Sequence, residues 1–399
     1  MTSASPGPTA SPASTATHAL PPLALYLHMP WCVKKCPYCD FNSHQLTGPK
    51  PDGTYIDALI EDCDRELPVL AGRRIETVFF GGGTPSLFAP EEIDRLLTAL
   101  RARLAFDPAA EVTLEANPGT IERGRFAGYR AAGINRVSLG AQSFGAAALA
   151  RLGRIHSADD THRAVDELRS AGIDNFNLDL MYALPEQSLA EAIFDVQTAC
   201  ALAPRHISHY QLTLEPGTVF HARPPALPDE DAAWNMQVEC QELLSDAGYE
   251  QYEVSAYAAA GARCRHNVNY WTFGDYLGLG AGAHGKLTRG LPADILRTAK
   301  PKQPRDYQRQ LAERGDAIGE RQRVARADLP FEFMLGALRL NAGFAVDDFE
   351  ARTGLRGDAI EAPLAVARAR GLIAQEGSVW RPTALGRRFL NDLQGTFLA

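Results

Sequence analysis

The stretch WCVKKCPYCDF, residues 31–41, places Cys32, Cys36 and Cys39 within eight positions of one loop. A structural zinc site needs four ligands, usually two pairs of cysteines or histidines, and no second pair with matching spacing follows here. Iron–sulfur clusters are also held by cysteine thiolates, ordinarily four. Three thiolates on a cubane cluster would leave one iron open to an exchangeable ligand, as a catalytic zinc keeps one position free. The loop therefore favours a metal centre with an open coordination position.

Six apolar segments bounded by glycine or proline read as strands, and the cysteine loop follows the first of them. Amphipathic stretches such as residues 90–104 and 159–172 lie between the segments and show the three- and four-residue apolar spacing of helices. Repeated strand–helix units imply a parallel sheet with right-handed crossovers, either open or curved into a partial barrel. The expected strands cover residues 23–30, 74–82, 111–119, 136–143, 175–185 and 206–214.

Polar residues and glycines gather where these expected strands end. In barrels and in open α/β sheets, sites form at the carboxyl ends of the strands. Chance would place one or two polar residues there, so five successive strand ends predict a single site on one rim. These residues are Cys32 after the first strand, Gly81 to Thr84 after the second, Glu115 and Asn117 at the end of the third, Gln142 at the end of the fourth and Asp179 within the fifth.

The composition of the chain excludes several classes of protein. Its 399 residues carry a formal net charge of −8, which gives no sign of a nucleic-acid-binding surface. No run approaches the roughly 20 consecutive apolar residues of a membrane span, although peripheral contact with a membrane stays open. Residues 1–20 are rich in Ser, Thr, Ala and Pro and lack the basic start and apolar centre of a secretory signal. We therefore expect a disordered tail over these residues and a cytoplasmic protein.

The strand–helix alternation stops after about residue 290, which predicts two domains. Residues 21–290 would form the strand–helix domain and residues 291–399 a smaller, mainly helical one. In the smaller domain, residues 371–394 read as a short hairpin followed by a helix. This pattern is typical of a winged helix, and the acidic charge balance favours a substrate lid or packing domain over a DNA-binding one.

The cysteine loop resembles the signature of the radical S-adenosylmethionine superfamily, CxxxCxxC after the first strand with an aromatic residue, Tyr38, before the last cysteine. FFGGGTPS, residues 79–86, resembles the superfamily's glycine-rich stretch, in which glycines let the backbone approach a small zwitterion. From about Tyr26 to the C-terminus, the chain resembles the branch around oxygen-independent coproporphyrinogen oxidase, and most closely its heme chaperones. The resemblance implies an α/β fold, a radical SAM partial (β/α)6 barrel with a small, mainly helical, winged-helix-like C-terminal domain.

The resemblance also implies which residues hold ligands. The three cysteines, Cys32, Cys36 and Cys39, would bind a [4Fe-4S] cluster, and the amino and carboxylate groups of S-adenosylmethionine would chelate its open iron. The residue types suit this ligand, because a carboxylate pairs with its ammonium group and a guanidinium with its carboxylate. The positions that match the family's contacts with S-adenosylmethionine are Tyr26, Tyr38, Gly82, Gly83, Thr84, Glu115, Gln142, Arg154, Asp179 and Thr213.

Two further positions bear on the activity that the resemblance implies. Phe41 stands where the oxidases of this branch carry a fourth cysteine, which argues against oxidase activity. HNVNYW, residues 266–271, matches the HNxxYW motif of the heme-chaperone branch. Imidazole is a standard axial ligand of heme iron, and aromatic rings can pack on a porphyrin face. The resemblance therefore implies heme as a third ligand, with His266 as the candidate iron ligand.

Two functions of different classes follow from these features. The first is a heme chaperone that binds heme and transfers it to acceptor hemoproteins, respiratory-chain proteins among them, without binding nucleic acid. The second is an enzyme, a coproporphyrinogen III oxidase that uses a 5′-deoxyadenosyl radical, or another radical enzyme with an unknown substrate. Phe41 and the HNxxYW motif favour the chaperone.

Overall fold

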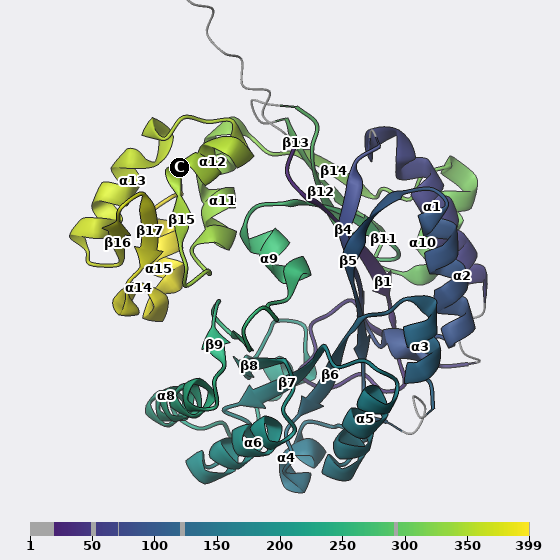
Figure 1. The fold of residues 1–399 in the computed structure, drawn as a ribbon, viewed down its shortest axis with the longest axis horizontal. Helices are drawn as coiled ribbons and strands as arrows, with labels where there is room; N and C mark the ends of the chain where they lie inside the picture. Colours follow the sequence, from purple (N-terminus) through teal and green to yellow (C-terminus); the bar gives the residue numbers. More distant parts are fainter. Residues whose placement is uncertain (1–19, 49–52, 71, 120–123, 291–293, 399) are drawn as a thin grey trace, which may run out of the picture.

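The computed structural model describes residues 20–48, 53–70, 72–119, 124–290 and 294–398 (Figure 1). The tail expected over residues 1–20 lies outside the described residues, apart from the exposed Leu20. Figure 1 shows a curved sheet with helices on its outer face and a smaller domain beside its open side. Within the described ranges, no helix is long and apolar enough to cross a membrane.

All six strands expected from the sequence are present and lie side by side in parallel. Most of their residues are buried, which explains why the segments read as continuous apolar runs rather than as alternating patterns. The strands are β1 (Leu23–Met29), β4 (Arg74–Gly82), β5 (Ala105–Ala116), β6 (Arg136–Gln142), β7 (Phe176–Tyr182) and β8 (His206–Gln211).

Helices follow these strands and cover the outer face of the sheet (Figure 1). In α2, Ile93, Leu96, Leu97 and Leu100 are buried, and their spacing places them on one stripe against the strands. The helices of this part of the chain are α1 (Gly53–Leu70), α2 (Pro90–Arg101), α3 (Phe126–Ala132), α4 (Ala146–Arg151), α5 (Ala158–Ser170), α6 (Leu189–Ala201), α7 (Val219–Ala222) and α8 (Glu230–Asp246).

The sheet is extended at both edges by strands that the sequence did not indicate. On one side β11 (Asp275–Leu279) pairs in parallel with β1, and three antiparallel strands follow it. On the other side β10 (Ala256–Ala258) pairs antiparallel with β8. The sheet is therefore mixed and does not close into a full barrel. The remaining strands are β12 (His284–Thr288), β13 (Ile295–Ala299), β14 (Glu320–Arg323) and β9 (Glu250–Gln251), and the order is β14-β13-β12-β11-β1-β4-β5-β6-β7-β8-β10-β9.

The strands β13 and β14 lie beyond residue 290 and yet belong to the large sheet. The helix after β13, α10 (Pro304–Arg314), is also tied to α1, because the Tyr307 hydroxyl donates a hydrogen bond to Asp62 at 2.9 Å. The buried Lys300 pairs with the same carboxylate at 2.6 Å. The boundary at residues 290/291 stays a prediction, and these contacts favour a boundary after β14.

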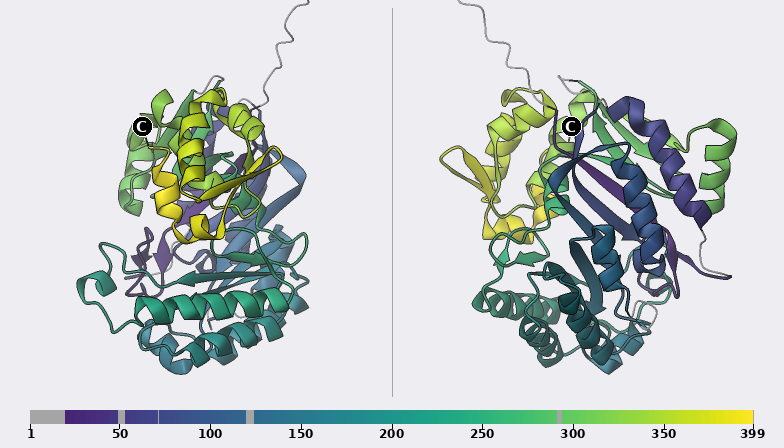
Figure 2. Two further views of the ribbon diagram at one scale, coloured as in Figure 1. Left: turned by 90° about the vertical axis from the view of Figure 1, so that its left-hand side faces the viewer. Right: turned by 45° about the vertical axis from the view of Figure 1, so that its right-hand side comes forward.

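The C-terminal part of the chain forms a small domain around a second hydrophobic core, which Phe273 and Ile295 join from the large-sheet part (Figure 2). Phe333, Phe349 and Leu393 lie at the centre of that core and are at most 1% exposed. A three-stranded antiparallel sheet packs with its helices, which confirms the expected winged-helix-like fold. The elements are α11 (Leu329–Ala337), β15 (Phe344–Ala345), α12 (Val346–Thr353), α13 (Asp358–Ala369), β16 (Ile373–Glu376), β17 (Val379–Pro382), α14 (Ala384–Arg388) and α15 (Leu390–Gly395).

One short helix, α9 (Arg265–Trp271), lies between the sheet and the C-terminal domain (Figure 1). It contacts β1, β4 and β11 on one side and α11 on the other. This helix carries the HNVNYW motif, whose His266 lies against β4 inside the curved sheet and whose Trp271 lies against Arg339 of the second domain.

Candidate functional site

The cysteine loop is fastened at its base by a short parallel pair of strands. The first, β2 (Trp31–Cys32), pairs with β3 (His44–Gln45), and the amide of Leu46 donates a hydrogen bond to the Cys32 carbonyl at 2.9 Å. Because β2 follows β1 directly, this pair places the loop over the carboxyl ends of the parallel strands.

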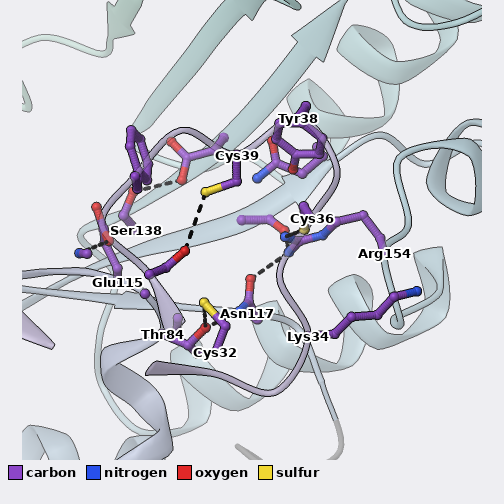
Figure 3. A pocket seen from close by; sticks show the side chains of 18 of the residues that line it. Cys32, Lys34, Cys36, Tyr38, Cys39, Thr84, Glu115, Asn117, Ser138 and Arg154 are labelled. Atoms are coloured by element: carbon purple, nitrogen blue, oxygen red, sulfur yellow. Dashed lines mark hydrogen bonds between the residues drawn. The ribbon is translucent and has the colours of Figure 1, made fainter. Parts of the chain in front are cut away.

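The three thiols of the loop face one pocket, which we call the thiol pocket (Figure 3). All three cysteines are half-buried and free of disulfides. The opposite wall comes from the carboxyl ends of β4 to β8, the rim on which the sequence predicts a site. The predicted residues that line this pocket are Cys32, Cys36, Tyr38, Cys39, Gly82, Gly83, Thr84, Glu115, Gln142, Arg154 and Asp179.

Each thiol has a polar neighbour that can stabilise its ionised form. Burial raises the pKa of the Cys32 and Cys39 thiols, and hydrogen bonds partly offset this, from the Thr84 side chain at Cys32 and from the Phe41 backbone and Ser43 side chain at Cys39. Hydrogen bonds of this kind favour a thiolate, the form that binds metals. The pairs are Thr84 Oγ1 donating to Cys32 Sγ at 3.6 Å, Arg154 Nη1 donating to Cys36 Sγ at 3.6 Å, and Ser43 Oγ with Cys39 Sγ at 3.8 Å.

This donor set fits an iron–sulfur cluster better than a single metal ion. In the part of the chain that the structure describes, no three His, Cys, Asp or Glu side chains are grouped so that they could hold one ion. The thiols are instead spread around a shared pocket, which suits a cluster of several atoms.

The glycine-rich stretch after β4 allows backbones to approach closely. A Cβ atom on Gly83 would lie 2.5 Å from the carbonyl oxygen of Trp31, so any side chain there would collide with the base of the cysteine loop. Gly82 has a φ of +114°, which disfavours other residues, and its Cβ would lie 2.6 Å from the His28 ring. These two positions therefore require glycine for steric reasons, before any ligand is considered.

Two buried carboxyl groups face the thiols across the pocket. Burial, with a smaller contribution from Asp179, raises the pKa of Glu115 to about 8, although the Gly82 amide donates to its Oε2 at 3.2 Å. Burial also raises the pKa of Asp179, which accepts hydrogen bonds from Ser138 Oγ at 3.1 Å and Asn177 Nδ2 at 2.7 Å. Both carboxyl groups are thus held rigidly where a cationic or hydroxyl-bearing ligand would find an acceptor.

Arg154 joins the cysteine loop to the strand ends. Its Nη2 donates to Asn117 Oδ1 at 2.5 Å and to the Gly140 carbonyl at 2.8 Å. Asn117 in turn donates to Thr84 Oγ1 at 2.9 Å, so the guanidinium is fixed from two sides. The buried Nε of Arg154 has no hydrogen-bond partner among the described residues, which leaves one donor for an anionic group.

The structure adds residues that the sequence did not assign to the site. Asn117 was recognised only as a strand-end residue, and it holds Arg154 in place. Tyr210 lines the pocket and donates a hydrogen bond to Gln142 Oε1 at 2.8 Å. The signal for Tyr210 was its position on β8, because its side of that strand faces the same interior as Asp179 on β7.

Two of the positions that were expected to contact S-adenosylmethionine lie outside the thiol pocket. Tyr26 is in the middle of β1, where its hydroxyl and His28 Nδ1 are 3.0 Å apart, and it lines two neighbouring cavities instead. Thr213 is exposed just beyond β8 and lines none of the cavities beside the thiols. Its role as a ligand contact stays a prediction.

His266 is buried deep in the curved sheet, with 1% of its surface exposed. Its Nδ1 is 2.8 Å from Thr77 Oγ1, its Nε2 is 3.0 Å from the Tyr270 hydroxyl, and its ring stacks on Phe79. Burial lowers the pKa of this imidazole to about 3, so the ring is neutral. Because both ring nitrogens are hydrogen-bonded, iron ligation by His266 would require one of these bonds to break; it stays a prediction.

Comparison with known proteins finds a matching family model for each of the two parts of the chain. Residues 26–196 match the model of the radical SAM superfamily, and residues 324–389 match that of the HemN C-terminal domain. In fold, the chain is similar to coproporphyrinogen III oxidase (HemN) from Escherichia coli, with a TM-score of 0.82 and 24% identity over 96% of this chain and 91% of that one.

Relatives of nearly the same length share much of the sequence. The chain is 48% identical to heme chaperone HemW of Escherichia coli (strain K12), over 95% of this chain and 99% of that protein. It is 47% identical to heme chaperone HemW of Haemophilus influenzae, over 95% of this chain and 98% of that protein. The resemblance seen in the sequence is thereby confirmed, and the chain belongs to the HemW family of radical SAM proteins.

Proposed function

We propose that this protein is a heme chaperone that binds heme and transfers it to acceptor hemoproteins. The observation that carries this proposal is the near full-length similarity to relatives that bear this name. We further propose that the thiol pocket binds a [4Fe-4S] cluster with S-adenosylmethionine, as the radical SAM match indicates. The acceptors would include respiratory-chain hemoproteins, and transfer would take place in the cytoplasm.

The residues of the thiol pocket support this cofactor assignment. Cys32, Cys36 and Cys39 would hold the cluster, whose fourth iron supplies a position for an exchangeable ligand. Glu115 and Arg154 lie across the pocket from the thiols and would bind the ammonium and carboxylate groups of S-adenosylmethionine. These two residues need little rearrangement for this task, because their neighbours already fix their side chains.

The proposal is tested by transfer of heme to an acceptor of known spectrum. Full-length protein, reconstituted anaerobically with iron and sulfide, is loaded with one equivalent of hemin and mixed with an excess of an apo b-type cytochrome. We expect the cytochrome spectrum to form, and we expect the chaperone to lose heme at the same rate. A chain that binds no hemin, or that binds it without releasing it to the acceptor, would contradict the proposed function.

The same preparations test the cluster assignment separately. Replacing Cys32, Cys36 and Cys39 together by alanine should abolish bound iron and sulfide. The matched control is Cys200→Ala, because Cys200 is a half-buried free thiol outside the loop. Iron and sulfide in the triple variant at the level of the control would contradict the assignment.

A further inference from the structure

A second cavity lies directly beside the thiol pocket, and we call it the side cavity. Its volume is about 460 Å³, within the roughly 300–1,000 Å³ usual for cofactor and small-molecule sites. Phe41, Gly82 and Glu115 line both cavities, so a ligand in one would lie next to a ligand in the other. The side cavity therefore offers a separate binding place at the edge of the cluster site.

Aromatic rings form much of the wall of the side cavity. Tyr270 of α9 and Tyr276 of β11 meet edge to face with ring centroids 4.6 Å apart, and both line it. Tyr26 lines it from β1, and Phe41 lines it from the cysteine loop with 60% of its surface exposed. An exposed phenylalanine beside a tyrosine wall is a suitable surface for the face of a large flat ring.

Two histidines line the side cavity, and only one of them has free ring nitrogens. His28 is 5% exposed, and its nitrogens are hydrogen-bonded with the Tyr26 hydroxyl at 3.0 Å and the Asn42 carbonyl at 2.8 Å. His284 is exposed at the start of β12, where its backbone pairs with Ala299 of β13, and its side chain makes no hydrogen bond or ion pair with the described residues. His266, whose nitrogens are both engaged, does not line this cavity.

The charge at the rim of the side cavity suits a ligand with carboxylate groups. Lys302 is exposed, and its ammonium group has no partner among the described residues. Its backbone is held firmly, because its carbonyl accepts hydrogen bonds from Asn42 Nδ2 at 2.9 Å and His44 Nε2 at 3.1 Å. Of the two carboxyl groups that line the cavity, Glu115 has a raised pKa and Asp40 lies on the cysteine loop.

We propose that the side cavity is the heme site and that His284, rather than His266, supplies the axial imidazole to the iron. Phe41 and Tyr276 pack against the macrocycle, and Lys302 pairs with a propionate. This inference rests on the proposed function, because it assumes that heme is the cargo. The inference also assigns a role to Phe41, because this residue lines both the side cavity and the thiol pocket and would contact the heme.

The test is a hemin titration of the full-length, cluster-loaded protein and three alanine variants. We expect His284→Ala to weaken hemin binding at least roughly tenfold, as loss of groups at metal sites commonly does. His266→Ala and the control His221→Ala should bind hemin like the parent, since neither histidine lines the side cavity and His221 is exposed. Equal affinity of His284→Ala and the parent would overturn the inference.

A ligand exchange separates iron binding from a merely structural effect. In His284→Met, a thioether replaces the imidazole, so the absorption and electron paramagnetic resonance spectra of bound heme should change and its reduction potential should rise. A spectrum identical to that of the parent would overturn the role of His284. A parent protein that binds no hemin would instead refute the proposed function, and weakened binding in His266→Ala alone would return the role to His266.

Discussion

Glu115 occupies the point at which the cavities of this protein meet. It lines the thiol pocket, the side cavity and a third cavity inside the sheet that is also lined by His266. A carboxyl group in such a place is costly to ionise without a partner, which is why burial raises its pKa to about 8. Its charge is therefore expected to form when a cationic ligand arrives, and before binding the Glu115 carboxyl group holds its proton at neutral pH.

The raised pKa of Glu115 predicts a dependence of stability on pH in protein freed of iron and ligands. The folded protein holds this proton from the usual pKa of 4.5 up to about 8, so folding binds a proton and stability falls as pH rises through this window. The slope is about 1.4 kcal/mol per pH unit for one group. In Glu115→Gln this pH-dependent contribution is absent. The free energy of unfolding of the variant, relative to that of the parent, should therefore rise as the pH is raised from 5 to 8. Urea unfolding at several pH values measures the difference, and parallel profiles would contradict it.

Glu191 provides the matched control, because its pKa is shifted in the opposite direction. Its carboxylate accepts hydrogen bonds from the amide and hydroxyl of Ser188 at the start of α6, which lowers its pKa. Its contribution is present above the unfolded pKa and is lost as pH falls. Glu191→Gln should therefore be less stable than the parent, and the difference in the free energy of unfolding should not change between pH 6 and pH 8.

At the scale of the elements, the sequence predicted well those strands that are buried on both faces. Every residue of β6 is buried, so its run of apolar and small residues between turns could be read without knowledge of its partners. β5 was predicted only in part, over residues 111–119, because its first half contains Asp107 and Pro108 and is largely exposed. The position of the site could also be predicted, because polar residues directly after buried apolar strands are not needed for packing and therefore indicate a function.

The edge strands could not be predicted from local sequence. The four residues of β14 read ERQR and are all exposed, so no apolar pattern marks them as a strand. They are extended because they pair with β13, which itself pairs with β12. The side cavity was missed for the same reason, since it depends on β11 lying beside β1 and on α9 lying across both. Contacts of this kind are set by pairing between distant segments rather than by composition.

The close contact between Gly83 and the cysteine loop predicts a strong effect of a small substitution. In Gly83→Ala the new Cβ would lie 2.5 Å from the Trp31 carbonyl, and backbone atoms on both sides cannot move independently. We expect a loss of roughly 1–3 kcal/mol in stability, the usual cost of overpacking, and a loss of bound iron because the loop base shifts. Gly48→Ala is the control, since no atom lies within 4 Å of its Cβ position. Parent-like iron content and unfolding in Gly83→Ala would refute the steric argument.

At the scale of the whole molecule, α9 links the two domains to the cavities. Gly336 of α11 packs so closely on α9 that its Cβ would lie 3.0 Å from the carbonyl oxygens of Tyr270 and Trp271. Arg339 lies over the Trp271 ring at 4.3 Å and pairs with Glu253 at 2.9 Å. Tyr270 lines the side cavity on the opposite side of the same helix. One short helix therefore contacts the C-terminal domain and also forms part of the wall of the proposed heme site.

The shared fold with coproporphyrinogen III oxidase raises the question of whether this chain catalyses the same reaction. The fold alone does not decide this, because one scaffold can carry different activities. The residue two positions after Cys39 argues against oxidase activity. Phe41 lies there with 60% of its surface exposed, and it offers no thiol to the wall that the two cavities share.

We therefore expect no conversion of coproporphyrinogen III to protoporphyrinogen IX by the cluster-loaded protein. The assay is anaerobic incubation with S-adenosylmethionine and a reductant, followed by fluorescence of the oxidised porphyrins. Phe41→Cys should retain bound iron, because Cys32, Cys36 and Cys39 are untouched, and it should remain inactive, because the other residues that line the side cavity are unchanged. The same substitution should weaken hemin binding, since it removes a wall of the proposed heme site. Robust turnover by the parent would refute the chaperone as the sole activity, and unaltered hemin affinity in Phe41→Cys would show that this ring does not touch the heme.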